Sequence, residues 1–323
     1  MKVRLFVVFL FLVGAVPAFS EVSISQHEDC FRIEIDGKLF TEWQMKAWSV
    51  PYLYPVIGPN GENITRNYPM KKGVEGESQD HPHHRSIRFS HRDINGASFW
   101  SPDTSPKDRQ ARIDLVEVKK MESGPVGELI FVNSWKINGE EILSETVRLR
   151  FEPLPNREVL MDYDTTLTAT GGDATFGDNK DGGMGMRVAS TMVVKGHKTK
   201  QPGKGTIINS EGNKNTDAWG KRAKWADYSG PGPSGKTVGI AMFDHPENFR
   251  HPVHWHARDY GLMTANRFGT GHFEKKQGAK MGDGDYTIKK GETLPLRHRF
   301  FFHHGDAAAA GVADQYKVYI SGR

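Results

Sequence analysis

The chain has 323 residues, of which 37% are hydrophobic and 25% are charged, so it can bury a core in one large domain or two small ones. Its 43 Lys and Arg residues against 39 Asp and Glu give a formal net charge of +4, which argues against a nucleic-acid binder. The single cysteine, Cys30, excludes an internal disulfide and any cysteine-rich zinc or iron–sulfur centre. A metal ion would therefore need histidine and carboxylate ligands.

Residues 1–20 have the layout of a secretory signal peptide. Two cations precede an apolar run from Leu5 to Val16, and small residues follow it. The run has about a dozen residues, whereas a membrane span needs about twenty. We therefore expect an exported bacterial protein, periplasmic or extracellular, whose mature chain begins near Glu21 and does not insert stably into a membrane.

Beyond the leader, apolar residues recur with a period of two. In the clearest example, two alternating runs between Leu129 and Phe151 flank Asn138-Gly139, the sequence of a two-residue type I′ hairpin turn. Similar runs lie at 31–36, 111–118, 158–169, 184–189, 237–243, 258–264 and 284–304. No amphipathic stretch is long enough to cross between parallel strands.

The pattern predicts an all-β protein. We expect one large antiparallel β-sandwich over residues 21–323, and the supersandwich of galactose mutarotases is one form that such a sandwich takes. Residues 171–183 and 201–235 are dense in Gly, Lys, Asn and Pro, so we expect long loops there.

The densest polar cluster is Asp-His-Pro-His-His-Arg-Ser-Ile-Arg-Phe-Ser-His at residues 80–91. If a strand starts near His83, alternation places His83, Arg85 and His91 on the inner face and His84 on the other. At the rim of a core, an imidazole can act as a general acid, a general base or a metal ligand. His83, His84 and His91 are therefore candidate catalytic residues, and Arg85 is a candidate substrate ligand. The alternative is a solvated loop.

A second histidine-rich run covers residues 251–262. Alternation places His254, His256 and Arg258 on one face, with Trp255 opposite. We interpret His256 as a candidate catalytic residue and His254, Trp255 and Arg258 as candidate substrate ligands. Two histidines spaced in this way can also hold a metal ion, and they also occur in plain cleft walls.

Two further stretches combine charge with glycine or tryptophan. Four glycines surround Lys180 in residues 176–187, and such a loop lets the backbone approach a ligand closely. We interpret Lys180 as catalytic and Arg187 as a substrate ligand, or the loop as a hairpin tip with solvated charges. Trp219 and Arg222 suit stacking on a sugar ring and hydrogen bonding to its hydroxyls, unless the indole belongs to the core.

One tripeptide recurs, and three common motifs are absent. Asp-His-Pro begins at Asp80 and again at Asp244, which hints at two similar loop ends. The sequence holds no serine nucleophile elbow, no P-loop and no dinucleotide fingerprint after a strand.

Five motifs in the same order resemble the PmoA-like family of exported bacterial proteins. They are YPMKKGVEGESQDHPHHRSIRFSHRDINGASFW, FGDNKDGGMGMRVAS, WGKRAKWADYSGP, GIAMFDHPENFRHPVHWHARDYGLMTANRFG and FFFHHGDA. The resemblance covers about residues 50–305. The family pattern has a basic residue before Pro-Tyr-Leu-Tyr-Pro, whereas this chain has Val50 at that position. Because many members resemble parts of bacterial systems that degrade glycans, the resemblance implies a carbohydrate role.

Three functions follow from these residues. The first is a carbohydrate-active lyase, hydrolase or epimerase that uses His, Arg and Lys chemistry on a glycan or glycoside. The second is a non-catalytic glycan-binding protein with Trp219, Trp225 and Trp255 as its platform. The third is an oxidoreductase with a metal ion as its cofactor. The sequence leaves the cofactor, the sugar and the oligomeric state open.

Overall fold

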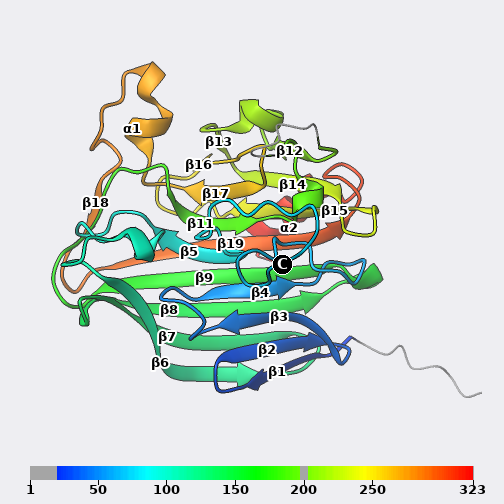
Figure 1. Cartoon of the computed structure of the whole chain (residues 1–323), viewed down its shortest axis with the longest axis horizontal. Coiled ribbons are helices and arrows are strands. Elements are labelled where there is room, and N and C mark those ends of the chain that lie inside the picture. Colours follow the sequence, from blue (N-terminus) through cyan, green and yellow to red (C-terminus); the bar gives the residue numbers. More distant parts are fainter. Residues whose placement is uncertain (1–19, 197–202, 323) are drawn as a thin grey trace, which may run out of the picture.

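Two large antiparallel β-sheets stack face to face in the computed structural model, which describes residues 20–196 and 203–322. In Figure 1 the blue strands of one sheet overlie the green strands of the other. This arrangement confirms the predicted all-β sandwich. The predicted leader, residues 1–20, lies outside the described residues except for Ser20.

The first sheet has nine strands. In spatial order they are β1 (Val22–Gln26), β2 (Cys30–Ile35), β3 (Lys38–Gln44), β4 (Tyr52–Val56), β5 (Ile87–His91), β11 (Gly182–Arg187), β17 (Leu262–Asn266), β16 (Val253–Trp255) and β13 (Arg222–Ala223).

The second sheet has eight strands. In spatial order they are β12 (Thr206–Asn209), β14 (Trp225–Pro231), β15 (Thr237–Asp244), β19 (Thr293–His304), β9 (Val159–Ala169), β8 (Glu140–Pro153), β7 (Gly127–Ile137) and β6 (Ala111–Glu122). Strands β10 (Ala174–Phe176) and β18 (Tyr286–Ile288) form a small third sheet.

The core fills the space between the two large sheets, where aromatic side chains from both sheets meet. The rings of Phe40 and Phe302 lie 5.3 Å apart, and those of Phe89 and Trp135 lie 5.9 Å apart. Each of these pairs joins a strand of the nine-stranded sheet to one of the eight-stranded sheet. Because side chains alternate along a strand, the residues between these core positions point out of the sandwich.

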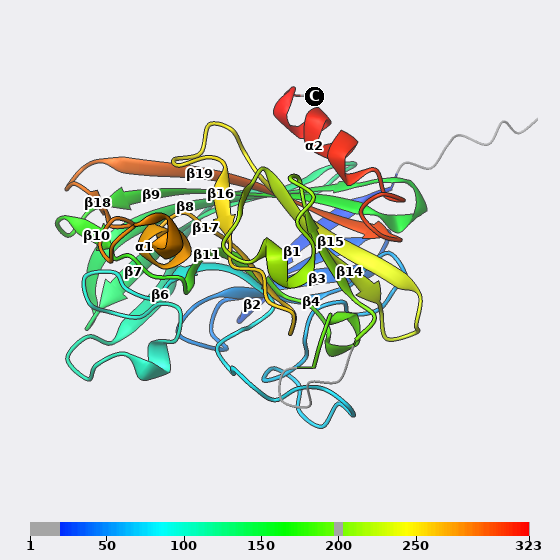
Figure 2. The same ribbon diagram turned by 90° about the horizontal axis from the view of Figure 1, so that it is seen from above.

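Two α-helices accompany the sheets, α1 (Thr270–Phe273) and α2 (Val312–Ile320). Val312 and Tyr316 of α2 pack against Phe243 and Phe301 on the outer face of the eight-stranded sheet, and Figure 2 shows α2 at one side of the molecule. Among the described residues, neither helix is long and apolar enough to cross a lipid bilayer.

The hairpin prediction is confirmed, but the loop prediction for residues 201–235 is wrong. Asn138 and Gly139 both have positive φ, 53° and 87°, as a type I′ turn requires, and β7 pairs with β8 across them. The described part of this segment, residues 203–235, contains the whole of β12, β13 and β14. Strand β14 is buried along nearly its whole length, so it shows no alternation that would reveal it.

Candidate functional site

The nine-stranded sheet carries a row of polar side chains on the face that points away from the sandwich. Phe89, Met184 and Ala265 belong to the core, so their neighbours along β5, β11 and β17 face outward. Arg88 pairs with Gly185, Gly185 pairs with Thr264, and Thr264 exchanges backbone hydrogen bonds with His256. These four residues therefore form one line across the sheet.

A glycine in that line creates space between the side chains of Arg88 and Thr264. A Cβ atom at Gly185 would lie 2.9 Å from Cγ2 of Thr264, which is closer than real Cβ atoms approach. The neighbouring line runs from Asn266 to His254 and Arg222. The predicted segments around 83, 180 and 256 thus meet on one face, although they are far apart in the sequence.

Asp80 anchors the loop that carries the first histidine cluster. Its Oδ1 accepts hydrogen bonds from Arg66 Nη1 at 2.8 Å and from Arg187 Nη2 at 2.9 Å, and all three side chains are almost fully buried. Burial raises the pKa of Asp80. The bond to His81 and the charge of Arg187, with its other partners, lower the pKa by more than burial raises it, so the net pKa is well below the usual range. Arg187 is therefore an ion-pair partner of Asp80.

Four rings gather above this ion pair. His81 stacks on His84 and on Tyr260, with ring centroids 4.7 and 5.3 Å apart and interplanar angles of 8° and 4°. His83 meets His84 edge-on at 4.5 Å. The guanidinium of Arg187 lies 4.6 Å from the Tyr260 ring centre. The stack thus holds His83 against the edge of His84, whose ring in turn stacks on Tyr260 at 6.3 Å.

Asp181 links this cluster to the second histidine run. Lys180 Nζ lies 2.9 Å from its Oδ1, and Nδ1 of His256 lies 3.9 Å from the same oxygen. His256 Nδ1 is 2.8 Å from the carbonyl oxygen of Lys180. Because a carbonyl only accepts, Nδ1 carries the proton, and Nε2 keeps the lone pair.

Burial keeps the two histidines of the site uncharged near neutral pH. It lowers the pKa of His83 to about 3, with the charge of Arg88 adding to the effect, and lowers that of His256 to about 4. The carboxylate of Asp181 opposes both shifts, so it acts on both rings. Burial also raises the pKa of Asp181, but its bond to Lys180 together with the charges of Lys180 and Arg92 outweighs this, and the net pKa is lowered.

We call His83, Lys180, Asp181, His256, Arg258 and Tyr260 the outer-face site. Arg258 and Tyr260 follow β16 in a turn that Gly261, with φ of 107°, brings back into β17. The guanidinium of Arg258 lies 5.3 Å from the Tyr260 ring centre. Lys180, His83 and Arg258 are partly exposed, whereas His256 and Tyr260 lie beneath them.

A second group adjoins the outer-face site. His254 Nε2 and Arg222 Nε both donate to Oε1 of Glu274, each at 2.8 Å. These three residues and Trp219 line a cavity of about 610 Å³, and the Trp219 ring lies 6.3 Å from that of His256. Burial, together with the charge of Arg222, lowers the pKa of His254 to about 4.

Two predicted site residues lie in the core. Trp255 is fully buried, and its Nε1 donates to the carbonyl of Ala223 at 2.9 Å. His91 is also fully buried, its Nε2 donates to the carbonyl of Gly177 at 2.7 Å, and its ring packs against Phe268. Both side chains are enclosed by the core, so the prediction of substrate binding by Trp255 and of a rim position for His91 is wrong.

The predicted strand at His83 is also wrong. His81 and Ser86 have positive φ, 43° and 38°, so the chain turns there, and β5 begins only at Ile87. His84 is 4% exposed and bonds Arg187 through Nδ1 at 3.2 Å, so it lies beneath His83 and not on the opposite side. Arg85 stacks on Trp48 at 4.4 Å.

The predicted tryptophan platform does not form. Trp225 packs with α2 on the outer face of the eight-stranded sheet, Trp255 lies in the core, and only Trp219 borders the outer-face site.

The sequence interpretation missed Asp181, Tyr260 and Arg88. Each is within three residues of a predicted site residue, and their charge or ring chemistry was the available signal. Within residues 20–196 and 203–322, no three His, Cys, Asp or Glu side chains are grouped so that they could hold a metal ion.

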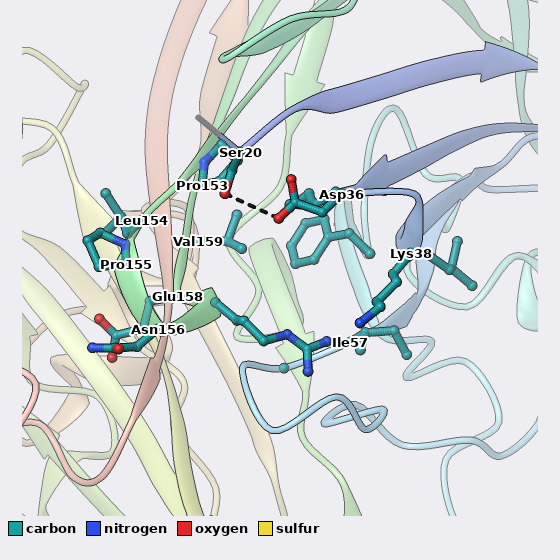
Figure 3. Close-up of a pocket in the computed structure, with 15 residues that line it drawn as sticks. Ser20, Asp36, Lys38, Ile57, Pro153, Leu154, Pro155, Asn156, Glu158 and Val159 are labelled. Carbon is teal, nitrogen blue, oxygen red and sulfur yellow. Dashed lines mark hydrogen bonds between the residues drawn. The ribbon is translucent and has the colours of Figure 1, made fainter. Parts of the chain in front are cut away.

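A separate cavity of about 310 Å³ lies between the β2–β3 turn and the β8–β9 turn. Figure 3 shows its lining, which includes Asp36, Lys38 and Glu158, and the hydrogen bond from Ser20 Oγ to Asp36 at 3.2 Å. It shares no lining residue with the outer-face site. No predicted site residue lies there.

Comparison with solved structures finds distant similarities. A polysaccharide lyase matches with 9% identity and a TM-score of 0.29, over 89% of this chain and 33% of that one. A 4-alpha-glucanotransferase from Thermococcus litoralis matches with 11% identity and a TM-score of 0.27, over 88% and 37%. A variant of a glycoside hydrolase family 97 enzyme from a Pseudoalteromonas species matches with 10% identity and a TM-score of 0.30, over 90% and 35%. The chain thus spans about a third of the length of each.

No curated protein matches the chain. Residues 30–317 match a family of unknown function, DUF6807, and this match includes the whole outer-face site. The chain therefore belongs to the DUF6807 family.

Proposed function

We propose that this protein is a carbohydrate-active enzyme that moves protons on a glycan or glycoside, as a lyase or an epimerase does, at the outer-face site. One observation carries the proposal: Asp181 lies 2.9 Å from Lys180 Nζ and 3.9 Å from His256 Nδ1, and the stack of His84 on Tyr260 brings His83, from a segment about 170 residues away, to the same face. The site thus combines two uncharged imidazoles with one carboxylate and two partly exposed cations, Lys180 and Arg258.

Proton abstraction next to a carbonyl or carboxylate needs a base and a cation. His256 Nε2 can accept a proton, because Nδ1 donates to the carbonyl of Lys180. The charges of Lys180 and Arg258 would stabilise the negative charge that develops on the substrate oxygen. His83, on the other side of Asp181, would return a proton or bind a hydroxyl.

The carboxylates of the site argue against a hydrolase. Retaining and inverting glycosidases use two carboxyl groups, one on each side of the scissile bond. Asp181 is the only carboxylate of the outer-face site. Asp80 is buried in its ion pairs with Arg66 and Arg187, and Glu274 is bound by Arg222 and His254. The hydrolase alternative is therefore the weaker one.

Export is part of the same proposal. The signal-like leader and the resemblance to PmoA-like exported proteins support an enzyme that works outside the bacterial cytoplasm, where it would meet glycans or their fragments.

The test is turnover of a panel of neutral glycans, uronic-acid glycans and oxidised glycosides. A lyase forms an unsaturated sugar that absorbs in the ultraviolet, and an epimerase exchanges a carbon-bound proton for deuterium. For a substrate that the wild type converts, His256→Gln should lower kcat about a hundredfold or more. His27→Gln, which changes an exposed histidine, is the matched control.

Two outcomes would overturn the proposal. The first is that His256→Gln turns over the substrate as fast as the control. The second is that the wild type binds a glycan of the panel and converts none, which would favour the glycan-binding alternative. In the expected case, kcat/KM falls below about pH 4, because protonation of His256 removes its lone pair.

A further inference from the structure

A small cavity lies under the first histidine cluster, against the outer face of β5 and β11. It is lined by His84, Arg85, Arg88, Trp100, Gly185 and Arg187 among others, and it has a volume of about 10 Å³. This is about the space that one water molecule needs. The His84 ring that lines it contacts His83 of the outer-face site at 4.5 Å, so the cavity adjoins the site.

Arg88 brings a charge into this cavity that no carboxylate balances. Its side chain is 3% exposed, and Nη2 donates to the carbonyl of Trp100 at 2.6 Å. The guanidinium lies 4.9 and 5.0 Å from the rings of Trp48 and Trp100. The one charged group that acts on it appreciably is another cation, Arg85. A buried charge without a counter-ion is costly, so this arrangement calls for an anion.

The contrast with Arg187 makes the imbalance clear. Arg187 and Arg66 share the carboxylate of Asp80, so a carboxylate faces each of them. Arg85 and Arg88 form no ion pair with any described carboxylate; Arg85 rests on the rings of Trp48 and Tyr52.

The buried polar atoms of the lining that lack a partner are all donors. They are Nε of Arg85, Nη1 of Arg88, Nε1 of Trp100 and Nε of Arg187. No side-chain acceptor atom of the described lining is buried without a partner. An anion accepts from several N–H groups at once and also balances the charge, whereas a water molecule does not balance it.

We propose that this cavity binds a small monovalent anionic group, held by Arg88 and Trp100. Two sources offer that chemistry: a halide ion from solution, or one oxygen of a sugar carboxylate. The second source rests on the proposed function and would make the substrate an acidic sugar. The anion site itself does not depend on any reaction.

The experiment measures binding on the full chain, without turnover. The melting temperature is followed while sodium bromide, sodium glucuronate or glucose is added, at constant ionic strength. A ligand at about 100 times its Kd should raise it by roughly 3 °C or more, and the rise should saturate. Bromide is also located by anomalous diffraction, with a peak expected beside Arg88 Nη1.

Arg88→Gln should abolish the saturable rise, and Arg112→Gln, which changes an exposed arginine of β6 in the other large sheet, should retain it. Saturation by bromide supports the proposal with solution as the source, and saturation by glucuronate alone supports it with a sugar as the source. If neither gives saturation or an anomalous peak, or if Arg88→Gln keeps the rise, the proposal is overturned. The diffraction arm needs only wild-type protein, so it decides even if Arg88→Gln fails to fold. If the wild type fails to convert any glycan in the turnover test, only the proposed function is contradicted, because the anion site is tested by binding alone.

Discussion

The two Asp-His-Pro tripeptides build two regions that share an anchor and differ in what surrounds it. Asp80 is buried between Arg66 and Arg187, and Asp244 is buried against Arg267, whose Nη2 donates to it at 2.6 Å. In both regions the aspartate is buried in ion pairs, and the two loop ends are similar in that respect, as the recurrence of the tripeptide had hinted. The repeated residues therefore hold their loops in place, and function has to come from the residues that follow.

Those following residues diverge. After Asp80 the chain presents His83 at the edge of the outer face, beside Tyr260 and Asp181. After Asp244, Asn248 and His251 turn back and bond the same carboxylate, and His245 packs edge-on against Tyr319 of α2 at 5.2 Å. The residues after Asp244 thus bond back to their own anchor, while the first region leaves imidazoles and cations available at the surface.

The largest expected effect is on stability, and it should be common to both regions. Asp80→Asn and Asp244→Asn each remove the counter-ion of buried guanidinium groups, which should lower the free energy of unfolding by about 3–5 kcal/mol. Urea unfolding measures this loss. Asp314→Asn removes an exposed partner of Lys317 and should change the free energy by less than about 0.5 kcal/mol. A loss below about 1 kcal/mol in either buried variant would contradict the anchoring role.

Activity should separate the two regions. For folded Asp80→Asn protein, we expect kcat/KM to fall about tenfold to a hundredfold, because His81, His84 and Tyr260 lose the support of the Asp80 ion pairs. Asp244→Asn should stay within about twofold of wild type once the rate is normalised to folded protein. Because Asp80 acts by positioning, His83 should shift its pKa in Asp80→Asn, which NMR titration of the ring can follow. Equal losses of activity in both variants would contradict the division of roles.

The strands were the most predictable part of the molecule, because their signal is local. Alternation from Leu129 to Phe151 predicted β7, β8 and their turn. Alternation failed at His83, because it assumes a continuous strand and the chain adopts positive φ at two residues there. Alternation also made His91 a candidate catalytic residue at the rim of the core. In the sequence, a histidine at the rim cannot be told from a core histidine that packs on Gly182 and bonds the Gly177 carbonyl.

The sequence predicted which segments form the site, but it did not predict which other residues lie beside them in the folded chain. The runs around His83, Lys180 and His256 do meet on one face, as expected. Asp181 joins them and Arg88 lies beside them, but neither role can be derived without knowing which strands are neighbours. Strands β5 and β11 pair although about 95 residues separate them, and no local pattern encodes that pairing.

A smaller effect should appear in the pH dependence of stability. Burial lowers the pKa of His298 to about 3 in the second region, as it lowers those of His83 and His256 in the first. Below about pH 6.5 these histidines bind protons in the unfolded chain but stay unprotonated in the folded one, so stability should fall as the pH drops from 6.5 toward 4. Each such histidine adds up to about 1.4 kcal/mol per pH unit.

His298→Gln should reduce that slope by about one proton, measured as the urea midpoint between pH 6 and pH 4.5. His27→Gln, at an exposed site, should leave the slope unchanged. The effect of His303 on stability has the opposite dependence on pH. Burial lowers the pKa of His303, but the charge and the hydrogen bond of Asp227 raise it by more, so the net pKa is raised. Its stabilisation is present below the unfolded pKa and is lost as the pH rises through the folded one. A slope in His298→Gln equal to that of wild type would contradict the assignment.

The smallest expected effect concerns the cavity in Figure 3, which lies in neither region. Its lining has two cations, Lys38 and Arg157, and two carboxylates, Asp36 and Glu158, and none of the stacked rings that order the outer-face site. Lys38 is exposed and forms no ion pair with a described residue, so Lys38→Ala should change the free energy of unfolding by less than about 0.5 kcal/mol. Turnover of any substrate that the wild type converts should stay within about twofold of wild type, because the substitution removes nothing that contacts His83 or His256. The assay is the one used for His256→Gln, run in parallel. A hundredfold loss in Lys38→Ala, with His256→Gln unaffected, would move the active site to this cavity and leave both Asp-His-Pro regions as structural anchors.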